Sequence, residues 1–289
     1  MLLAACGDST AGDSSVAVKA KITISSTTDP TNEMIAEIYG QALEQAEFRV
    51  ARKKPFATAD ELYTAMESGD VQLSATTTLA LLALLSADGS TTTSPPPTAT
   101  LLQTEAITTA LPANLKIGAT ATAEDKDVVY CATTFTDANT IATLTDLGTK
   151  PGLATLAAPD GFDTATPLGA AALKDTYDIE FKSILPAEVG DTLEPVTAGT
   201  ADCGIGRSGD PALAVETVTI LQDDKAVVPN DVIVPLVSTD VGTIDVTSVL
   251  DATSARLTPN ALRALMAALA AEGSTPESVA NAFIGSAGT

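Results

Sequence analysis

The sequence contains no histidine and no tryptophan among its 289 residues. Without an imidazole, the chain cannot use a histidine general base, a histidine-ligated metal or a Ser-His-Asp triad. No motif in the sequence places another nucleophile beside a base. An enzyme is therefore disfavoured, and we expect no cofactor and no metal site.

Basic residues are few, because 15 Lys and Arg stand against 37 Asp and Glu, for a formal net charge of -22. Such a surface repels nucleic acid and anionic membranes, so neither is expected to bind it. Hydrophobic residues make up 45% of the chain, which is enough to build a core in one large or two ordinary domains. The apolar run "LALLALL" at 79–85 is far shorter than the ~20 residues of a membrane span and predicts a buried helix.

The three cysteines fall into two groups. Cys6 lies in "LLAACGDST", whose small residues resemble a lipoprotein signal-peptidase site, and a Gly/Ser/Asp-rich tether follows it. We interpret residues 1–19 as a truncated signal and tether with Cys6 lipidated; a chance cysteine is the alternative, since the basic and long apolar parts of a signal are missing. A lipid on Cys6 would hold the protein on the outer face of the cytoplasmic membrane, an oxidising compartment where Cys131 and Cys203 could form a disulfide.

Strand and helix patterns alternate along the chain. A strand at 18–25, an amphipathic helix through Met34 to Leu43 and a strand at 48–54 form a β-α-β unit, and the same alternation continues to residue 238. Thr258-Pro259 and Thr275-Pro276 predict the starts of two terminal helices. Continuous β-α-β alternation predicts an α/β protein with parallel sheets and helices on both faces.

Small polar residues follow four of the predicted strands, at 25–29, 74–78, 158–162 and 207–210. In open α/β sheets, ligands bind beyond the carboxyl ends of the strands, where helix N-termini offer free N–H groups. Each segment also fits an ordinary helix cap or turn. Arg207 is the most informative residue, because a guanidinium can hold a ligand carboxylate through two hydrogen bonds. The alternative for Arg207 is a salt bridge between lobes, with Asp29 or Asp160.

The order of these segments resembles the substrate-binding proteins of glycine betaine/choline (osmoprotectant) ABC importers, across residues 20 to 289. The most specific part is "LTPNALRALMAAL" followed by a second helix that begins "PESVA". The resemblance implies a monomer with a two-lobed, type II periplasmic-binding-protein fold, two mostly parallel sheets, a solute in the cleft and an ABC permease as partner. Lobe 1 would take 20–127 with 231–289, and lobe 2 would take 128–230, with crossings near "EDKDVV" and "VPNDV".

Two aromatic positions of that family are occupied by other residues here. Where relatives place rings around a quaternary ammonium, this chain has Asp29 and the turn Ala75 to Ala80. Phe135 and Phe162 are the aromatic residues expected near the cleft, with Tyr130 a weaker third. A Thr/Ser/Asp surface favours a small polar or zwitterionic, amino-acid-like or osmoprotectant-like solute that forms hydrogen bonds. The residues predicted to bind it are Ser26, Thr27, Thr28, Asp29, Thr76, Thr77, Thr78, Phe135, Asp160, Phe162, Arg207 and Ser208.

The same mapping places the strands of Cys131 and Cys203 side by side in lobe 2, so it implies a Cys131–Cys203 disulfide. Two separately buried thiols are the alternative, and a reactive dithiol is disfavoured because only Arg207 is basic nearby in sequence. The leading function is a lipid-anchored solute-binding protein of an ABC importer. The alternative is an orphan envelope lipoprotein with the same fold, a degenerate ligand site and a regulatory or protein-binding role.

Overall fold

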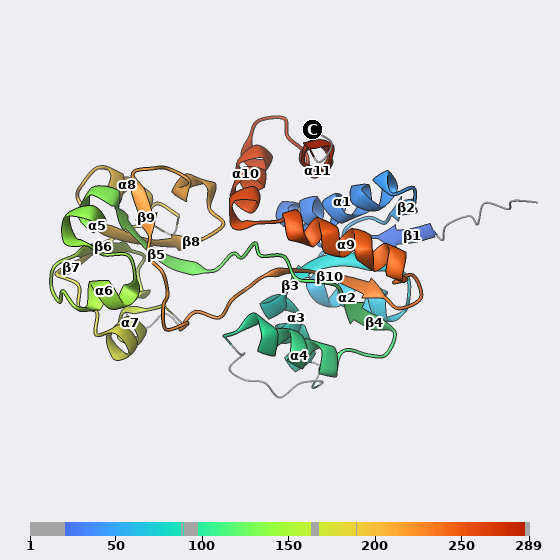
Figure 1. Ribbon diagram of the computed structural model, residues 1–289, viewed down its shortest axis with the longest axis horizontal. Helices are drawn as coiled ribbons and strands as arrows, with labels where there is room; N and C mark the ends of the chain where they lie inside the picture. Colours follow the sequence, from blue (N-terminus) through green and yellow to red (C-terminus); the bar gives the residue numbers. More distant parts are fainter. Residues whose placement is uncertain (1–20, 88, 90–97, 163–167, 189, 287–289) are drawn as a thin grey trace, which may run out of the picture.

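The computed structural model describes residues 21–87, 89, 98–162, 168–188 and 190–286. Within these ranges the chain forms two lobes, each built on a five-stranded sheet, joined by two extended segments (Figure 1). Residue 6 lies outside the described residues. None of the helices in the described part of the chain combines the length and apolar character that crossing a membrane requires.

The first sheet has the strand order β2-β1-β3-β10-β4. Helices cover both of its faces, as the sequence predicts, and one core lies under α1, α9, α10 and α11 while another lies under α2, α3 and α4. The strands are β1 (Lys21–Ile24), β2 (Arg49–Arg52), β3 (Leu73–Thr77), β4 (Leu115–Ile117) and β10 (Ile233–Ser238). The helices are α1 (Pro30–Gln45), α2 (Ala59–Glu67), α3 (Thr78–Ala87), α4 (Thr100–Ala110), α9 (Ile244–Arg256), α10 (Pro259–Ala270) and α11 (Pro276–Gly285).

The second sheet has the order β7-β6-β8-β5-β9 and likewise packs against helices, with two hydrophobic clusters in its lobe. Its strands are β5 (Asp127–Ala132), β6 (Thr155–Ala158), β7 (Ser183–Pro186), β8 (Cys203–Arg207) and β9 (Val218–Ile220). Its helices are α5 (Thr133–Asn139), α6 (Leu144–Gly148), α7 (Ala170–Tyr177) and α8 (Leu193–Thr197), with a 3₁₀ turn η2 (Pro211–Leu213).

Both sheets are mostly parallel, as predicted, and each contains one antiparallel strand. In the first, β10 runs antiparallel to β3 and β4, and in the second, β5 runs antiparallel to β8 and β9. β5 and β10 are the strands through which the chain enters each lobe from a crossing segment. They start at the gap between the lobes, so they run opposite to the strands that end there.

Helix starts follow the sequence signals. Asp29 accepts hydrogen bonds from the N–H groups of Thr31 and Asn32, and Pro30 occupies the first turn of α1. Thr258 and Thr275 cap α10 and α11 in the same way. The apolar run at 79–85 lies in α3, where Leu81, Leu82 and Leu85 are buried. Strand β5 ends at Ala132, because Thr133 already begins helix α5.

Cys131 and Cys203 form a disulfide, as predicted, between paired positions of the neighbouring antiparallel strands β5 and β8. Both side chains are fully buried in the core of the second lobe. The bridge closes a loop with a sequence separation of 72 residues. A loop of that length gives a stabilisation on the order of 4 kcal/mol in the chain-entropy model.

We predict that the double substitution Cys131→Ala with Cys203→Ala lowers the free energy of unfolding of the second lobe by about 4 kcal/mol, since the unfolded chain regains its loop entropy. Urea denaturation followed by far-UV circular dichroism measures the change. Dithiothreitol should destabilise the wild type and leave the double variant unchanged. Equal stability of the two proteins without reductant would contradict the prediction.

Candidate functional site

The carboxyl ends of β1 and β3 border a cavity of about 260 Å³, here called the first-lobe cavity. Three residues predicted from the sequence, Asp29, Thr76 and Thr77, line it together. Asp125 from the first crossing and Gly209 from the second lobe also line it. The remaining lining residues are Thr31, Asn32, Ile35, Ala75, Ile233, Leu262 and Met266.

Asp29 has two roles at this position. One oxygen of its exposed carboxylate caps α1, with distances of 2.9 and 3.0 Å to the N–H groups of Thr31 and Asn32. The carboxylate also lines the first-lobe cavity, so it presents negative charge there. No aromatic ring is among the described residues that line this cavity.

The end of β3 meets a half-buried carboxylate from the second crossing. Asp231 Oδ1 accepts a hydrogen bond of 2.9 Å from the N–H of Leu79, in the first turn of α3. Burial raises the pKa of Asp231 above its usual value, while hydrogen bonds from Leu79 and Thr77 oppose the shift. The hydrogen bond from Thr77 to Asp231 connects the edge of the first-lobe cavity to the second crossing.

The second lobe has a cavity of its own, of about 280 Å³, here called the second-lobe cavity. Phe162 and Arg207, both predicted site residues, line it together with Tyr130 and Asp127. The other lining residues are Pro159, Leu168, Gly190, Thr192, Leu193, Ile205, Gly206, Asp210 and Leu213. Phe162 closes a turn after β6 in which its N–H donates to Pro159 over 3.1 Å, and Gly161 supplies the positive φ of 86° that this turn requires.

Tyr130 lies flat on β8 because glycines face it. A Cβ at Gly204 would lie 2.5 Å from the Tyr130 hydroxyl, so any larger residue there would displace the ring. The hydroxyl bonds to Thr192 Oγ1 at 2.8 Å, and burial raises the pKa of Tyr130. Tyr130, the weakest of the three aromatic predictions, therefore lies in the second-lobe cavity with Phe162.

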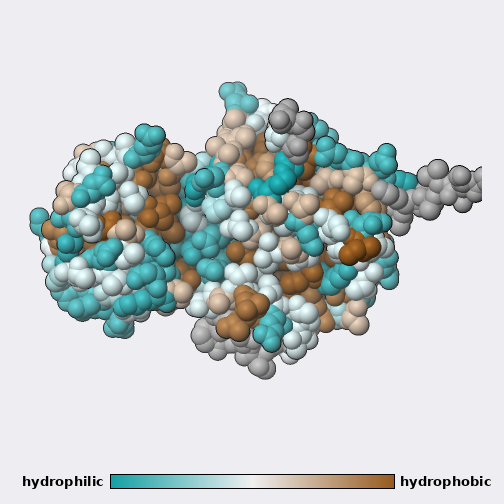
Figure 2. All heavy atoms as spheres, in the orientation of Figure 1, coloured by the Kyte–Doolittle hydropathy of each residue, from teal (hydrophilic) through white to brown (hydrophobic). Residues whose placement is uncertain are grey.

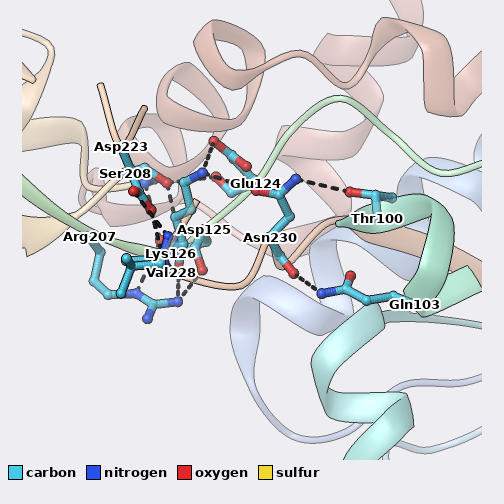
Figure 3. A network of polar contacts seen from close by, with 12 residues as sticks. Thr100, Gln103, Glu124, Asp125, Lys126, Arg207, Ser208, Asp223, Val228 and Asn230 are labelled. Atoms are coloured by element: carbon cyan, nitrogen blue, oxygen red, sulfur yellow. Dashed lines mark hydrogen bonds and ion pairs between the residues drawn. The ribbon is translucent and has the colours of Figure 1, made fainter. Parts of the chain in front are cut away.

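Arg207 forms an ion pair with Asp125 of the first crossing (Figure 3). Its guanidinium lies 3.3 Å from Asp125 Oδ2 and 3.1 Å from Asp127 Oδ1, and it also donates to the carbonyl of Asp125. Burial alone would lower the pKa of Arg207, but the two carboxylates outweigh it and raise the pKa. Its salt-bridge partners are these two residues rather than Asp29 or Asp160. Because Asp125 lines one cavity and Arg207 the other, the ion pair marks where the cavities adjoin.

Ser208 and Thr78 hold the crossing segments in place. The Ser208 hydroxyl accepts from the N–H of Lys126 and donates to the carbonyl of Glu124, each over 3.0 Å. The fully buried Thr78 donates to Gln103 Oε1 over 2.7 Å and accepts from the N–H of Val232 over 3.3 Å. Both hydroxyls are therefore used inside the protein, at the crossings.

Asn230 extends this network from the second crossing into the first lobe (Figure 3). Its carbonyl accepts a hydrogen bond of 2.7 Å from Gln103, and its side chain bonds to Lys126 and to Thr100. Lys126 in turn pairs with Glu124 over 3.1 Å. The two crossings are thus bound to each other and to helix α4.

The other predicted residues lie outside both cavities. Ser26 is buried and donates to the carbonyl of Thr27, while Thr28 is exposed and its N–H bonds to Phe56. Asp160 is exposed in the turn after β6. Phe135 packs on the core of the second lobe, because α5 begins at Thr133 and turns it inward. Thr27 accepts a hydrogen bond of 2.9 Å from Asn32, beside the first-lobe cavity.

Sequence reasoning missed Asn32, Asp125, Gly209 and Met266 as cavity-lining residues. The sequence did place Asp125 near the cleft, since it lies in the predicted first crossing. Gly209 is close to Asp125, where an added Cβ would lie 3.0 Å from its Oδ1. Met266 lies far away in sequence on α10, and no local pattern marks it; it accepts a contact of 3.4 Å from the Thr31 hydroxyl.

The lobes face each other across a gap, with hydrophilic atoms around the crossings and apolar surface on the side of the second lobe that faces the first (Figure 2). Helix α10 extends from the first lobe toward η2 of the second. Arg263 on α10 donates a hydrogen bond of 2.9 Å to the carbonyl of Ser208. We call the two cavities together the interlobe site, because Asp125 lines the first and forms an ion pair with Arg207, which lines the second.

The fold is similar to that of two solved structures. One is the crystal structure of a glycine betaine/carnitine/choline ABC transporter, at 14% identity and a TM-score of 0.77, with 92% of this chain and 98% of that chain covered. The other is apo YehZ from Escherichia coli, at 18% identity and a TM-score of 0.78, with 93% and 99% covered. No curated protein matches the sequence.

Two sheets with a polar site between them, joined by two crossings, define a type II substrate-binding protein. Residues 20–286 match the family described as the substrate binding domain of ABC-type glycine betaine transport systems. Because the match spans nearly the whole chain, the protein belongs to this family. It is an extracytoplasmic solute-binding protein of an ABC importer, and the family is one of binding proteins, not enzymes.

We predict that Thr78→Val lowers the free energy of unfolding by about 1–3 kcal/mol, since it leaves the buried N–H of Val232 without its acceptor at nearly unchanged volume. Thermal and urea denaturation measure the effect. Thr108→Val, at an exposed position of α4, is the matched control and should change stability by no more than about 0.5 kcal/mol. Equal effects of the two substitutions would show that the Thr78 hydroxyl does not stabilise the crossing.

Proposed function

We propose that the protein captures a small zwitterionic solute with N–H donors, similar to an amino acid, and delivers it to an ABC permease. The observation behind this proposal is the composition of the first-lobe cavity. It presents the carboxylates of Asp29 and Asp125 with the hydroxyl-bearing Thr76 and Thr77, at the position where betaine-binding relatives are expected to place rings.

The chemistry of the two ligand classes differs. A quaternary ammonium has no N–H to donate, so aromatic faces hold it best. A primary or secondary ammonium donates charge-assisted hydrogen bonds to carboxylates, which are stronger than neutral ones. Asp29 is exposed at the first-lobe cavity and suits such a donor.

Arg207 suits the other end of the solute. Its side chain is half exposed at the second-lobe cavity, and its five N–H donors exceed the number that two carboxylate partners require. A solute carboxylate bound at Arg207 would lie across the gap from Asp29. The zwitterion would thus connect the two lobes.

Closure of the lobes would complete the site. We place lobe 1 at residues 20–127 with 231–289 and lobe 2 at 128–230, so that both boundaries fall at the crossing segments. In this proposal the protein is a monomer. Its lobes close about residues near 124–127 and 228–232, and the closed form docks on the permease. Nucleic acid is not a partner.

We predict that proline, alanine and serine raise the melting temperature, because a ligand that binds only the folded protein stabilises it by about 2.7 kcal/mol at 100 times its Kd. Glycine betaine, choline and carnitine, at matched concentrations, should give little or no shift. Differential scanning fluorimetry measures the series. Shifts with betaine or choline alone would reject the proposed ligand class, and no shift with any solute would favour an orphan regulatory lipoprotein.

The variant Asp29→Asn sharpens the test. Asparagine still caps a helix, so the fold is kept while the negative charge is lost. Losing a charge-assisted hydrogen bond should weaken binding of the amino acids about tenfold by calorimetry. Asp60→Asn, at the exposed start of α2, is the control and should bind as the wild type does.

We also propose that Cys6 carries a lipid anchor that holds the protein on the outer face of the cytoplasmic membrane. Support comes from the sequence around Cys6, since the residue lies outside the described ranges. In a bacterial host with lipoprotein processing, the full protein should incorporate labelled palmitate and sediment with membranes. Cys6→Ala should abolish the label and release the protein, whereas a label that persists in Cys6→Ala would reject the assignment.

A further inference from the structure

A third cavity, of about 160 Å³, adjoins the first-lobe cavity at the end of β3. The two cavities share four lining residues, Asn32, Ala75, Thr76 and Thr77. One polar strand end therefore borders both spaces. We call this third cavity the side pocket.

The side pocket lies on the opposite face of the sheet from the first-lobe cavity. Alternate residues of a strand point to opposite faces. Ala75 packs in the core under α1 and α10, whereas Leu236, the strand partner of Ser74, packs in the core under α2 and α3. The side pocket is lined by residues of α2, α3 and β10, so it belongs to that second face.

The side pocket is lined mainly by apolar side chains, and polar residues border it where it adjoins the first-lobe cavity, here called its mouth. Its apolar lining residues include Leu62, Met66, Leu81, Leu84 and Leu236, together with the ring of Tyr63. At the mouth, the Asn32 amide donates to Thr27 Oγ1 over 2.9 Å, and both residues line the side pocket. A group that enters from the first-lobe cavity would pass from hydrogen-bonding side chains to hydrocarbon.

Protein cores seldom contain voids much larger than a water molecule, so an apolar space beside a ligand site calls for an occupant. A cavity of about 160 Å³ is large enough for several water-sized groups. That is the size of an aliphatic amino-acid side chain. Asp29, at the first-lobe cavity, would remain available to the ligand ammonium.

We propose that the side pocket receives the aliphatic side chain of an amino-acid ligand whose ammonium binds at Asp29 in the first-lobe cavity. This inference rests on the proposed function and narrows it to amino acids with apolar side chains of about leucine or methionine size. The polar strand end holds the backbone atoms of the ligand, and α2 and α3 select its side chain.

Calorimetric titration of the full chain with alanine, leucine and methionine tests the proposal. Leucine and methionine should bind at least about tenfold more tightly than alanine, because each additional buried CH₂ group favours binding. Equal affinities, or binding of alanine with exclusion of leucine, would overturn this inference and leave the proposed function intact. Failure of all three amino acids to bind would overturn both.

Two variants locate the effect. Ala80→Leu adds bulk at a residue that lines the side pocket but not the first-lobe cavity, and it should reduce leucine affinity to about that of alanine. Leu84→Ser makes the same pocket polar and should also reduce leucine affinity. Alanine affinity should stay within about twofold in both variants, since the CH₂ groups affected are absent from that ligand.

Ala83→Leu is the matched control, because Ala83 is an exposed position on the same helix and does not line the side pocket. It should keep the wild-type ratio of leucine to alanine affinity. If Ala80→Leu and Ala83→Leu behave alike, or if Leu84→Ser leaves leucine binding unchanged, the side chain binds elsewhere and the proposal is wrong.

Discussion

The chain passes between its two sheets twice, and each passage must begin a strand at the gap. β5 and β10 are those strands, and they run antiparallel to their neighbours. The other strands therefore end at the gap, with their polar loops and the N-terminal ends of the following helices around it. Asp29, Thr77 and Arg207 come from different parts of the sequence and lie around the interlobe site because of this arrangement.

Charge is distributed unevenly around that site. In a chain with a net charge of -22, Arg207 is held between Asp125 and Asp127 at the first crossing. The pair lies at the junction of the two cavities, while Asp29 presents negative charge on the first lobe. An acidic site attracts cationic groups over several ångströms and raises their local concentration. The fixed guanidinium gives that field a direction, so a zwitterion would be oriented as it enters.

Much of the fold could be predicted because its signals are local. Asp29-Pro30 and Thr275-Pro276 begin helices in the structure as in the sequence. The cysteine pairing followed from a family resemblance, since 72 residues separate the partners. The residues that line the cavities were harder to predict. Thr76 and Thr77 line the first-lobe cavity, but Thr78 points into the protein, because one further residue already belongs to α3. Met266 and Asn32 depend on how α10 and α1 pack, which no local pattern encodes.

The disulfide has a mechanical consequence. It fastens β5, the strand that leaves the first crossing, to β8, the strand that ends at Arg207. Arg207 and Asp127 therefore lie on two strands that are paired and covalently joined. A displacement of the guanidinium would be passed on to the first crossing. A solute bound to Arg207 would therefore rotate the second lobe as a rigid body about the short segment around Glu124 and Asp125.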